Sequence, residues 1–125
     1  MLRFALIFGG AAGLLAVFIA AGTAHDLKDQ LAPKAIAWVE TAVRYQMWHA
    51  LALLGAGALI AWRPRRTLTV AVLAWTAGIV LFCGTLYLLA FTGATALGLG
   101  AAAGGIALLV GWGAIVWYGI GVRGD

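Results

Sequence analysis

The feature that most constrains the fold is a stretch of 56 residues, 67–122, that contains no Lys, Arg, Asp, Glu or His. As one straight helix this stretch would be about 84 Å long, whereas the hydrocarbon core of a bilayer is about 30 Å thick. The stretch must therefore turn once, and Thr-Gly-Ala-Thr at 92–95 is the natural place for the turn. We predict two membrane spans here, at about 67–91 and 97–121.

The composition of the 125-residue chain also indicates a membrane protein, because 65% of its residues are hydrophobic and only 10% are charged. A soluble domain carries charge on about a quarter of its residues. The formal net charge of +4 would suggest a nucleic-acid ligand in a soluble protein. Here the basic residues flank apolar spans, so we expect no nucleic-acid partner and take the lipid bilayer as the predicted partner.

Two further spans are predicted in the N-terminal half of the chain. The first covers about 4–22, which is longer than the ~7–15-residue core of a signal peptide, so we expect it to be retained as a span. Pro33 suits the first turn of a helix, and we expect a second helix to begin near it and to span the membrane at about 43–62. The sequence therefore predicts one all-α domain, an up-down four-helix bundle integral to the membrane.

The distribution of charge predicts the orientation of the bundle. With four spans, the two termini and the turn at 63–66 lie on one side, and the arginines of that side are Arg3, Arg63, Arg65, Arg66 and Arg123. The charged residues of the other side are Lys28, Lys34, Asp26, Asp29 and Glu40, with Arg44 at its margin. Because basic residues favour the cytoplasmic side, we expect both termini in the cytoplasm and the protein in the cell inner membrane.

Stripes of small residues on two spans predict where helices pack. Gly9 and Gly13 share one face of the first span, and Gly100, Gly104 and Gly111 share one face of the fourth. Small residues let helix backbones approach closely in lipid. The stripes would serve packing within one chain, or the contacts of a homo-oligomer or a larger membrane complex.

Polar side chains in the outer half of the predicted bundle form the candidate site: His25, Tyr45, Gln46, His49, Thr85 and Tyr87. His49 lies roughly 9 Å past residue 43 along its helix, and a titratable group at such depth is by default a functional hypothesis. We expect its partner to be Tyr45 or Gln46 on the same helix, or Thr85 or Tyr87 on the third span. Glu40 and Arg44, four residues apart, are also in the favourable order for an ion pair at the interface.

Several interpretations of the polar cluster remain open. The simplest is that the side chains hydrogen-bond across helices and hold the bundle together, each contributing about 0.6 kcal/mol. A site for a lipid, a quinone or another small molecule is the second interpretation, and haem or metal ligation by His25 with His49 is the third. Catalysis by Cys83 is disfavoured because nothing nearby would activate its thiol. We expect no catalytic residue, no bound metal and no cofactor, and a small transporter would need an oligomer to form a pathway.

Four motifs resemble those of a known family: Gly-Thr-Ala-His-Asp-Leu at 22–27, Thr-Ala-Val-Arg-Tyr-Gln-Met-Trp-His-Ala-Leu-Ala-Leu at 41–53, Phe-Cys-Gly-Thr-Leu-Tyr-Leu at 82–88, and Gly-Gly at 104–105 with Gly-Trp at 111–112. Together they resemble the small bacterial membrane proteins catalogued as domain of unknown function 423, which are related to the eukaryotic transmembrane protein 256. The resemblance implies a four-helix inner-membrane protein from a family without an established activity, and it brings no catalytic residues. Asp26 stands where the family favours glycine, and Cys83 and Thr85 stand where it favours serine.

The predicted function is therefore that of a multi-pass membrane protein, non-enzymatic, acting as an accessory or lipid-interacting component. The alternatives are a ligand-, quinone- or haem-binding redox module and a small oligomeric transporter.

Overall fold

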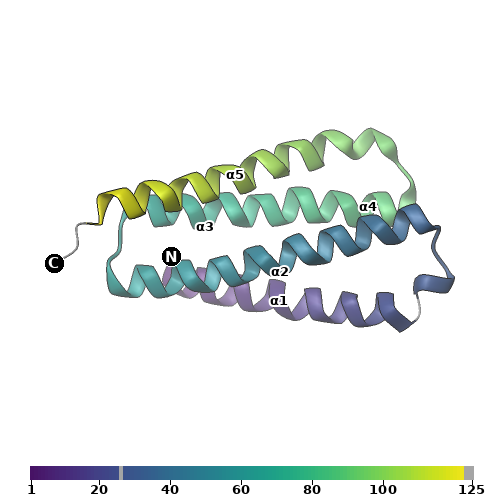
Figure 1. Cartoon of the computed structure of the whole chain (residues 1–125), viewed down its shortest axis with the longest axis horizontal. Helices are drawn as coiled ribbons and strands as arrows, with labels where there is room; N and C mark the ends of the chain where they lie inside the picture. The colour runs from purple at the N-terminus through teal and green to yellow at the C-terminus, as the bar shows by residue number, and fades with distance from the viewer. Residues whose placement is uncertain (26, 123–125) are drawn as a thin grey trace.

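The protein is made of four long helical segments, seen in a computed structural model that describes residues 1–25 and 27–122 (Figure 1). The first two segments are α1 (Leu2–His25) and α2 (Pro33–Trp62), joined through the short 3-10 turn η1 (Leu27–Asp29). The third segment consists of α3 (Arg66–Gly78), the π-helical turn η2 (Ile79–Cys83) and α4 (Gly84–Thr92). The 3-10 turn η3 (Thr95–Leu97) leads into the last helix, α5 (Gly98–Gly121).

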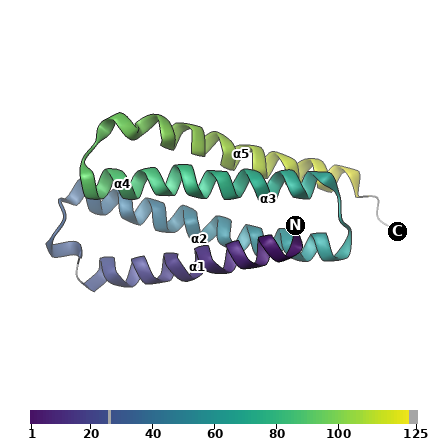
Figure 2. The ribbon, with the colours of Figure 1, turned by 180° about the vertical axis from the view of Figure 1, so that it is seen from behind.

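The four segments run alternately up and down, so the all-α up-down bundle predicted from the sequence is confirmed. The N-terminus, the α2–α3 connection and the end of α5 lie at one end of the molecule, and the other two connections lie at the opposite end (Figures 1 and 2). In both views α1 and α5 occupy opposite edges, with α2 and the third segment between them. α1 packs mainly on α2, whereas α5 packs mainly on α3 and η2.

Three helical stretches of the described chain are long and apolar enough to cross a membrane: Leu2–His25, Arg66–Thr92 and Gly98–Gly121. The 30-residue α2 is about 45 Å long, which exceeds the thickness of the hydrocarbon core. It is the most polar of the four segments because its first third carries charge and its apolar part contains Tyr45, Gln46 and His49. The most polar helix thus lies between the others, where neighbouring helices can provide hydrogen-bond partners for these polar side chains.

The turn between α4 and α5 depends on one glycine. Gly93 has a φ of +68°, and its backbone N–H donates to the carbonyl oxygen of Leu89 at 2.9 Å. A residue with a Cβ pays a steric cost in this left-handed conformation, whereas glycine does not. Gly93 therefore ends α4 and lets the chain reverse into α5.

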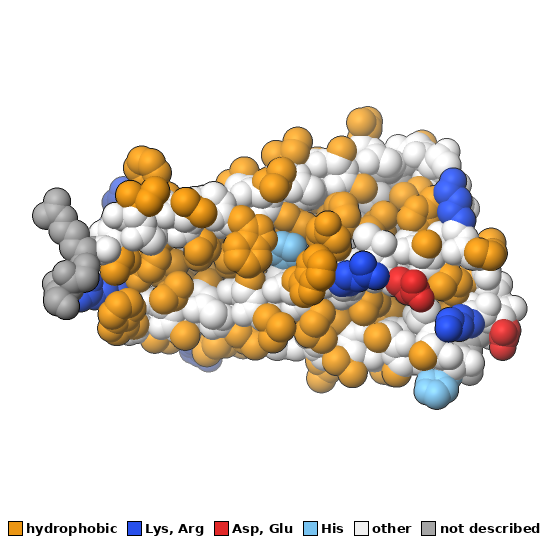
Figure 3. Space-filling model, in the orientation of Figure 1, with side chains coloured by type: hydrophobic (Ala, Val, Ile, Leu, Met, Phe, Trp, Pro, Cys, Tyr) orange, Lys and Arg blue, Asp and Glu red, His pale blue; other side chains and the backbone are white. Residues whose placement is uncertain are grey.

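The interior of the bundle is narrow and built around Leu53 on α2 and Trp75 on α3, both essentially inaccessible. The outer surface is apolar too: Leu14 on α1 is 74% exposed and Leu99 on α5 is 83% exposed. Figure 3 shows hydrophobic side chains over most of one face, with acidic side chains only toward the end that carries the α1–α2 connection. An apolar surface of this extent suits contact with lipid rather than water.

The packing of α5 relies on glycines. A Cβ at Gly104 would overlap the backbone of Phe82, and a Cβ at Gly111 would overlap the indole ring of Trp75. Gly9 of α1 approaches the carbonyl oxygen of Ala50 in a similar way. Close backbone approach of this kind is the usual use of small residues between membrane helices.

Candidate functional site

Two buried polar side chains of α2 define the middle of the bundle. Gln46 and His49 stand three residues apart, and each is only 3% exposed. Our sequence-based hypothesis placed them in one cluster that faces the third span. In the structure they belong to two separate hydrogen-bond networks that involve different neighbouring helices.

Gln46 joins α1, α2 and α4. Its Nε2 donates to the carbonyl oxygen of Ala12 at 2.8 Å, and its Oε1 accepts from the hydroxyl of Tyr87 at 2.8 Å. The carbonyl oxygen of Ala12 belongs to the backbone of α1, so the amide bridges three helices with one side chain. Unsatisfied polar groups are costly in hydrocarbon, and this arrangement provides both ends of the amide with a partner.

His49 joins α2 and α5. The indole N–H of Trp112 donates to Nε2 of His49 at 3.0 Å, and Nδ1 lies 2.7 Å from the carbonyl oxygen of Tyr45. Because an indole nitrogen can only donate, Nε2 must accept, and the proton then resides on Nδ1, where it is donated to Tyr45. These partners assign a neutral imidazole of defined tautomer with both ring nitrogens engaged.

Aromatic rings surround this histidine. The ring centroids of Tyr45, Trp75 and Trp112 lie 6.1, 6.3 and 5.9 Å from that of His49. Trp75 and Trp112 also meet edge to face at 4.9 Å, a geometry that aromatic pairs favour. The indole nitrogen of Trp75 is buried beside Gly111 and has no hydrogen-bond partner.

A groove of about 680 Å³ opens beside this cluster between α2 and α5, and we call it the aromatic groove. Its walls include Tyr45, Trp48, Phe82, Leu109 and Trp112. Trp48 is 52% exposed and Trp112 is 47% exposed, so the groove opens onto the outer surface of the bundle. Its lining is almost wholly apolar, which suits a hydrocarbon chain better than a polar substrate.

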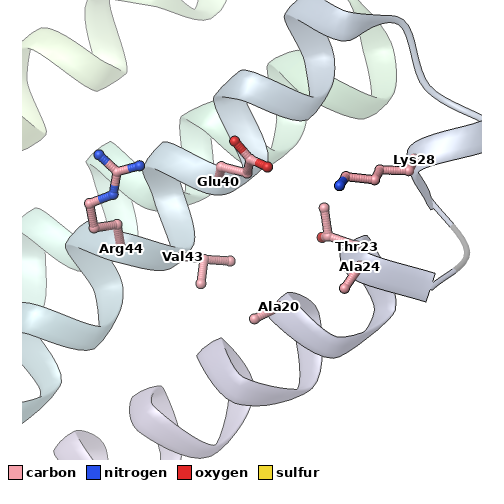
Figure 4. Close-up of a pocket in the computed structure, with 7 residues that line it drawn as sticks. All are labelled: Ala20, Thr23, Ala24, Lys28, Glu40, Val43 and Arg44. Atoms are coloured by element: carbon pink, nitrogen blue, oxygen red, sulfur yellow. The ribbon is translucent and has the colours of Figure 1, made fainter.

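A second hollow of about 480 Å³ lies at the end of the bundle that carries the α1–α2 connection, and we call it the terminal pocket (Figure 4). Ala20, Thr23 and Ala24 of α1, Lys28 of η1, and Glu40, Val43 and Arg44 of α2 line it. The predicted ion pair between Glu40 and Arg44 is not formed, and their side chains point in different directions in Figure 4. Both residues are exposed or nearly so, and a solvated pair gains too little to hold two long side chains in one geometry.

The other candidate residues do not join either network. His25 is exposed at the end of α1, whereas His49 is buried 16 residues beyond the start of α2, about 24 Å along that helix. The two histidines therefore cannot share a metal or a haem iron within one chain. Thr85 faces Gly100 of α5, and Cys83 is buried within η2. No group of three His, Cys, Asp or Glu residues suited to a metal ion occurs among the described residues.

Sequence reasoning missed the role of two tryptophans. Trp112 lies nine residues before the end of α5 and hydrogen-bonds to His49. Trp75 was not considered, although it is the largest fully buried side chain. The sequence did contain one indication of the contact between Trp112 and His49. An indole N–H inside an apolar span needs a hydrogen-bond acceptor, and His49 is one of the few acceptor side chains in the spans.

Comparisons with known proteins place the chain among membrane proteins without an assigned activity. The family model described as "Protein of unknown function (DUF423)" matches residues 19–105. A UPF0382 membrane protein of Haemophilus influenzae is 38% identical over 100 residues, 80% of each chain. UPF0382 membrane protein YwdK of Bacillus subtilis is 37% identical over 86% of this chain and 88% of its own, and UPF0382 inner membrane protein YgdD of Escherichia coli K12 is 32% identical over 88% and 84%. No solved structure matches the chain.

Proposed function

The chain belongs to the membrane-protein family described as "Protein of unknown function (DUF423)", and we propose that it acts in the inner membrane as a non-enzymatic component that binds lipid. One observation carries the proposal: Gln46 and His49, the two buried polar side chains of α2, are both engaged in hydrogen bonds between or within helices. Gln46 bonds to Tyr87 and the α1 backbone, and His49 bonds to Trp112 and the α2 backbone. These groups hold helices together, so they are not free to activate a substrate or ligate a metal.

The outer surface of the bundle supports the proposal that the protein binds lipid. Large apolar side chains are exposed along α1 and α5, and the aromatic groove offers a recessed apolar path between α2 and α5. Lipid tails would fill this groove without any change in the hydrogen bonds beneath it. His49, the histidine that lines the groove, is not available to a quinone carbonyl, because both of its nitrogens are already engaged.

The function is tested with the purified protein in detergent. We expect a colourless protein whose unfolding temperature rises with added phospholipid, because a ligand of the folded state stabilises it by mass action. Ubiquinone and haem, added at the same concentrations, are expected to leave the unfolding temperature unchanged. A Soret band, or a quinone-dependent rise that disappears in Trp112→Phe, would overturn the proposal.

The proposed orientation places the N-terminus and the α2–α3 connection in the cytoplasm. Arg3 and the arginines at 63, 65 and 66 lie toward this end, whereas Lys28, Asp29 and Glu40 lie toward the other. Arg123 and Asp26, which also entered the charge argument, lie outside the described residues. The excess of arginine supports the cytoplasmic assignment of that end.

Cysteine labelling tests this orientation. In a Cys83→Ala background we would introduce Pro64→Cys in the α2–α3 connection and Thr95→Cys in η3, two exposed positions at opposite ends. A membrane-impermeant maleimide should label Thr95→Cys on spheroplasts and Pro64→Cys only after permeabilisation. Labelling of Pro64→Cys from outside would reverse the assigned orientation.

A further inference from the structure

The terminal pocket gathers charges of both signs that do not neutralise one another. Lys28 of η1 and Glu40 of α2 extend toward it, whereas Arg44, one turn further along α2, lines it but directs its guanidinium away from Lys28 (Figure 4). None of these three described residues forms an ion pair with another. Two cations and one anion thus surround a hollow of about 480 Å³, within the range of about 300–1,000 Å³ that is typical of small-ligand sites.

The floor of the pocket is apolar and continues into the side of the bundle. Ala20 and Val43 lie between the charged side chains, one on each helix. One turn deeper along α1 is Val17, which is 59% exposed, and two turns deeper along α2 is Leu51, which is 58% exposed. A molecule with a charged head in the pocket could therefore lay hydrocarbon chains along exposed apolar side chains toward the middle of the membrane.

We propose that the terminal pocket binds the headgroup of an ethanolamine phospholipid, an inference that rests on the lipid-binding function proposed above. The phosphate would lie beside Lys28, with Arg44 turning in toward it from α2, and the ammonium would donate hydrogen bonds to the carboxylate of Glu40. Arginine offers a planar set of donors that matches phosphate, and hydrogen bonds between charged partners are about twice as strong as neutral ones. The Arg44 guanidinium reaches the phosphate by rotation of its exposed side chain, a common change on binding.

The charge of Glu40 selects among phospholipids. A primary ammonium carries three N–H donors for the carboxylate. A choline headgroup carries the same charge but no N–H donor, and a glycerol headgroup carries no cation and brings only a negative phosphate near Glu40. An ethanolamine lipid alone among these satisfies the carboxylate as well as both cations.

The experiment is native mass spectrometry of the full-length protein in detergent with an equimolar mixture of dioleoyl phosphatidylethanolamine, phosphatidylcholine and phosphatidylglycerol. The wild type should retain the ethanolamine lipid over each of the others by about tenfold, the ratio expected from one charge-assisted hydrogen bond. Glu40→Gln should abolish this preference, and the double variant Lys28→Gln/Arg44→Gln should lower retention of all three lipids. Asp29→Asn and Lys34→Gln, at the same end but outside the pocket, are the matched controls and should behave as wild type.

All the substituted side chains are exposed or half-buried, and the unfolding temperature of each variant would verify its fold. A preference that persists in Glu40→Gln, or that is lost equally in Asp29→Asn, overturns the assignment of the pocket. Retention of all three lipids without preference also overturns it, but leaves the proposed lipid-binding function standing. Failure to retain any lipid overturns the proposed function itself.

Discussion

The sharpest test of the packing is Gly104→Ala in α5. A methyl group at this position would meet the backbone nitrogen and Cα of Phe82 and would come within 2.8 Å of its Cβ. These atoms belong to the π-helical turn η2, and backbone cannot rotate away as the end of a flexible side chain can. The substitution must therefore push α5 away from the third segment.

The size of the effect follows from two opposing terms. Overpacking a close contact costs about 1–3 kcal/mol, and contact with backbone puts this site at the upper end. Alanine gains about 1 kcal/mol over glycine in a helix interior. Gly104→Ala should therefore lower the free energy of unfolding by about 2 kcal/mol.

Gly113→Ala on the same helix is the matched control, because nothing lies within 4 Å of its added Cβ. Only the helix propensity of alanine matters there, so the free energy of unfolding of the control should rise by up to about 1 kcal/mol. The free energies of unfolding of the two variants should then differ by about 3 kcal/mol. The assay is unfolding in mixed detergent micelles by titration with SDS, followed by circular dichroism. Equal midpoints for the two variants would refute the close approach of α5 to Phe82.

Three further experiments test the hydrogen bonds and the turn. Tyr87→Phe should cost about 0.6 kcal/mol, and a double-mutant cycle with Gln46→Leu should recover that coupling; a coupling of zero would contradict the bond. In the wild type, ¹⁵N NMR should show His49 protonated only at Nδ1, whereas Trp112→Phe should give a mixture of tautomers; an Nε2–H form in the wild type would exclude the assigned geometry. Gly93→Ala should lower stability by about 1–2 kcal/mol from its left-handed backbone alone, and thermal unfolding equal to wild type would argue against that turn.

The polar network shows where sequence reasoning reached its limit. Gln46, His49 and Tyr87 were all identified as buried candidates, because polar residues inside an apolar run need partners. Of the partners predicted for His49, Tyr45 accepts a hydrogen bond through its backbone carbonyl oxygen. The partner from another helix was predicted on the third span but is Trp112 of α5, 63 residues further along the chain. Helical spacing defines the angle between two side chains on one helix but not which neighbouring helix each will meet.

The charged end of the bundle shows that spacing along one helix does not determine an ion pair. The spacing of Glu40 and Arg44 predicts a local ion pair, yet the structure sets both around a pocket together with Lys28 from η1. An i, i+4 pair at an exposed site contributes only about 0.3–0.5 kcal/mol, so side-chain entropy and a nearby third charge readily override it.

The sequence by itself determined that the chain is a helical membrane bundle with its helices in alternating directions. It could do so because uncharged runs of limited length must cross the membrane as helices, which satisfy their own backbone hydrogen bonds. Only the tertiary structure decided that Gln46 and His49 serve different helices, that Gly104 admits the backbone of Phe82, and that Lys28, Glu40 and Arg44 surround one pocket. The physical reason is that these contacts depend on the rotation and separation of whole helices, which hydropathy and spacing along one helix do not specify.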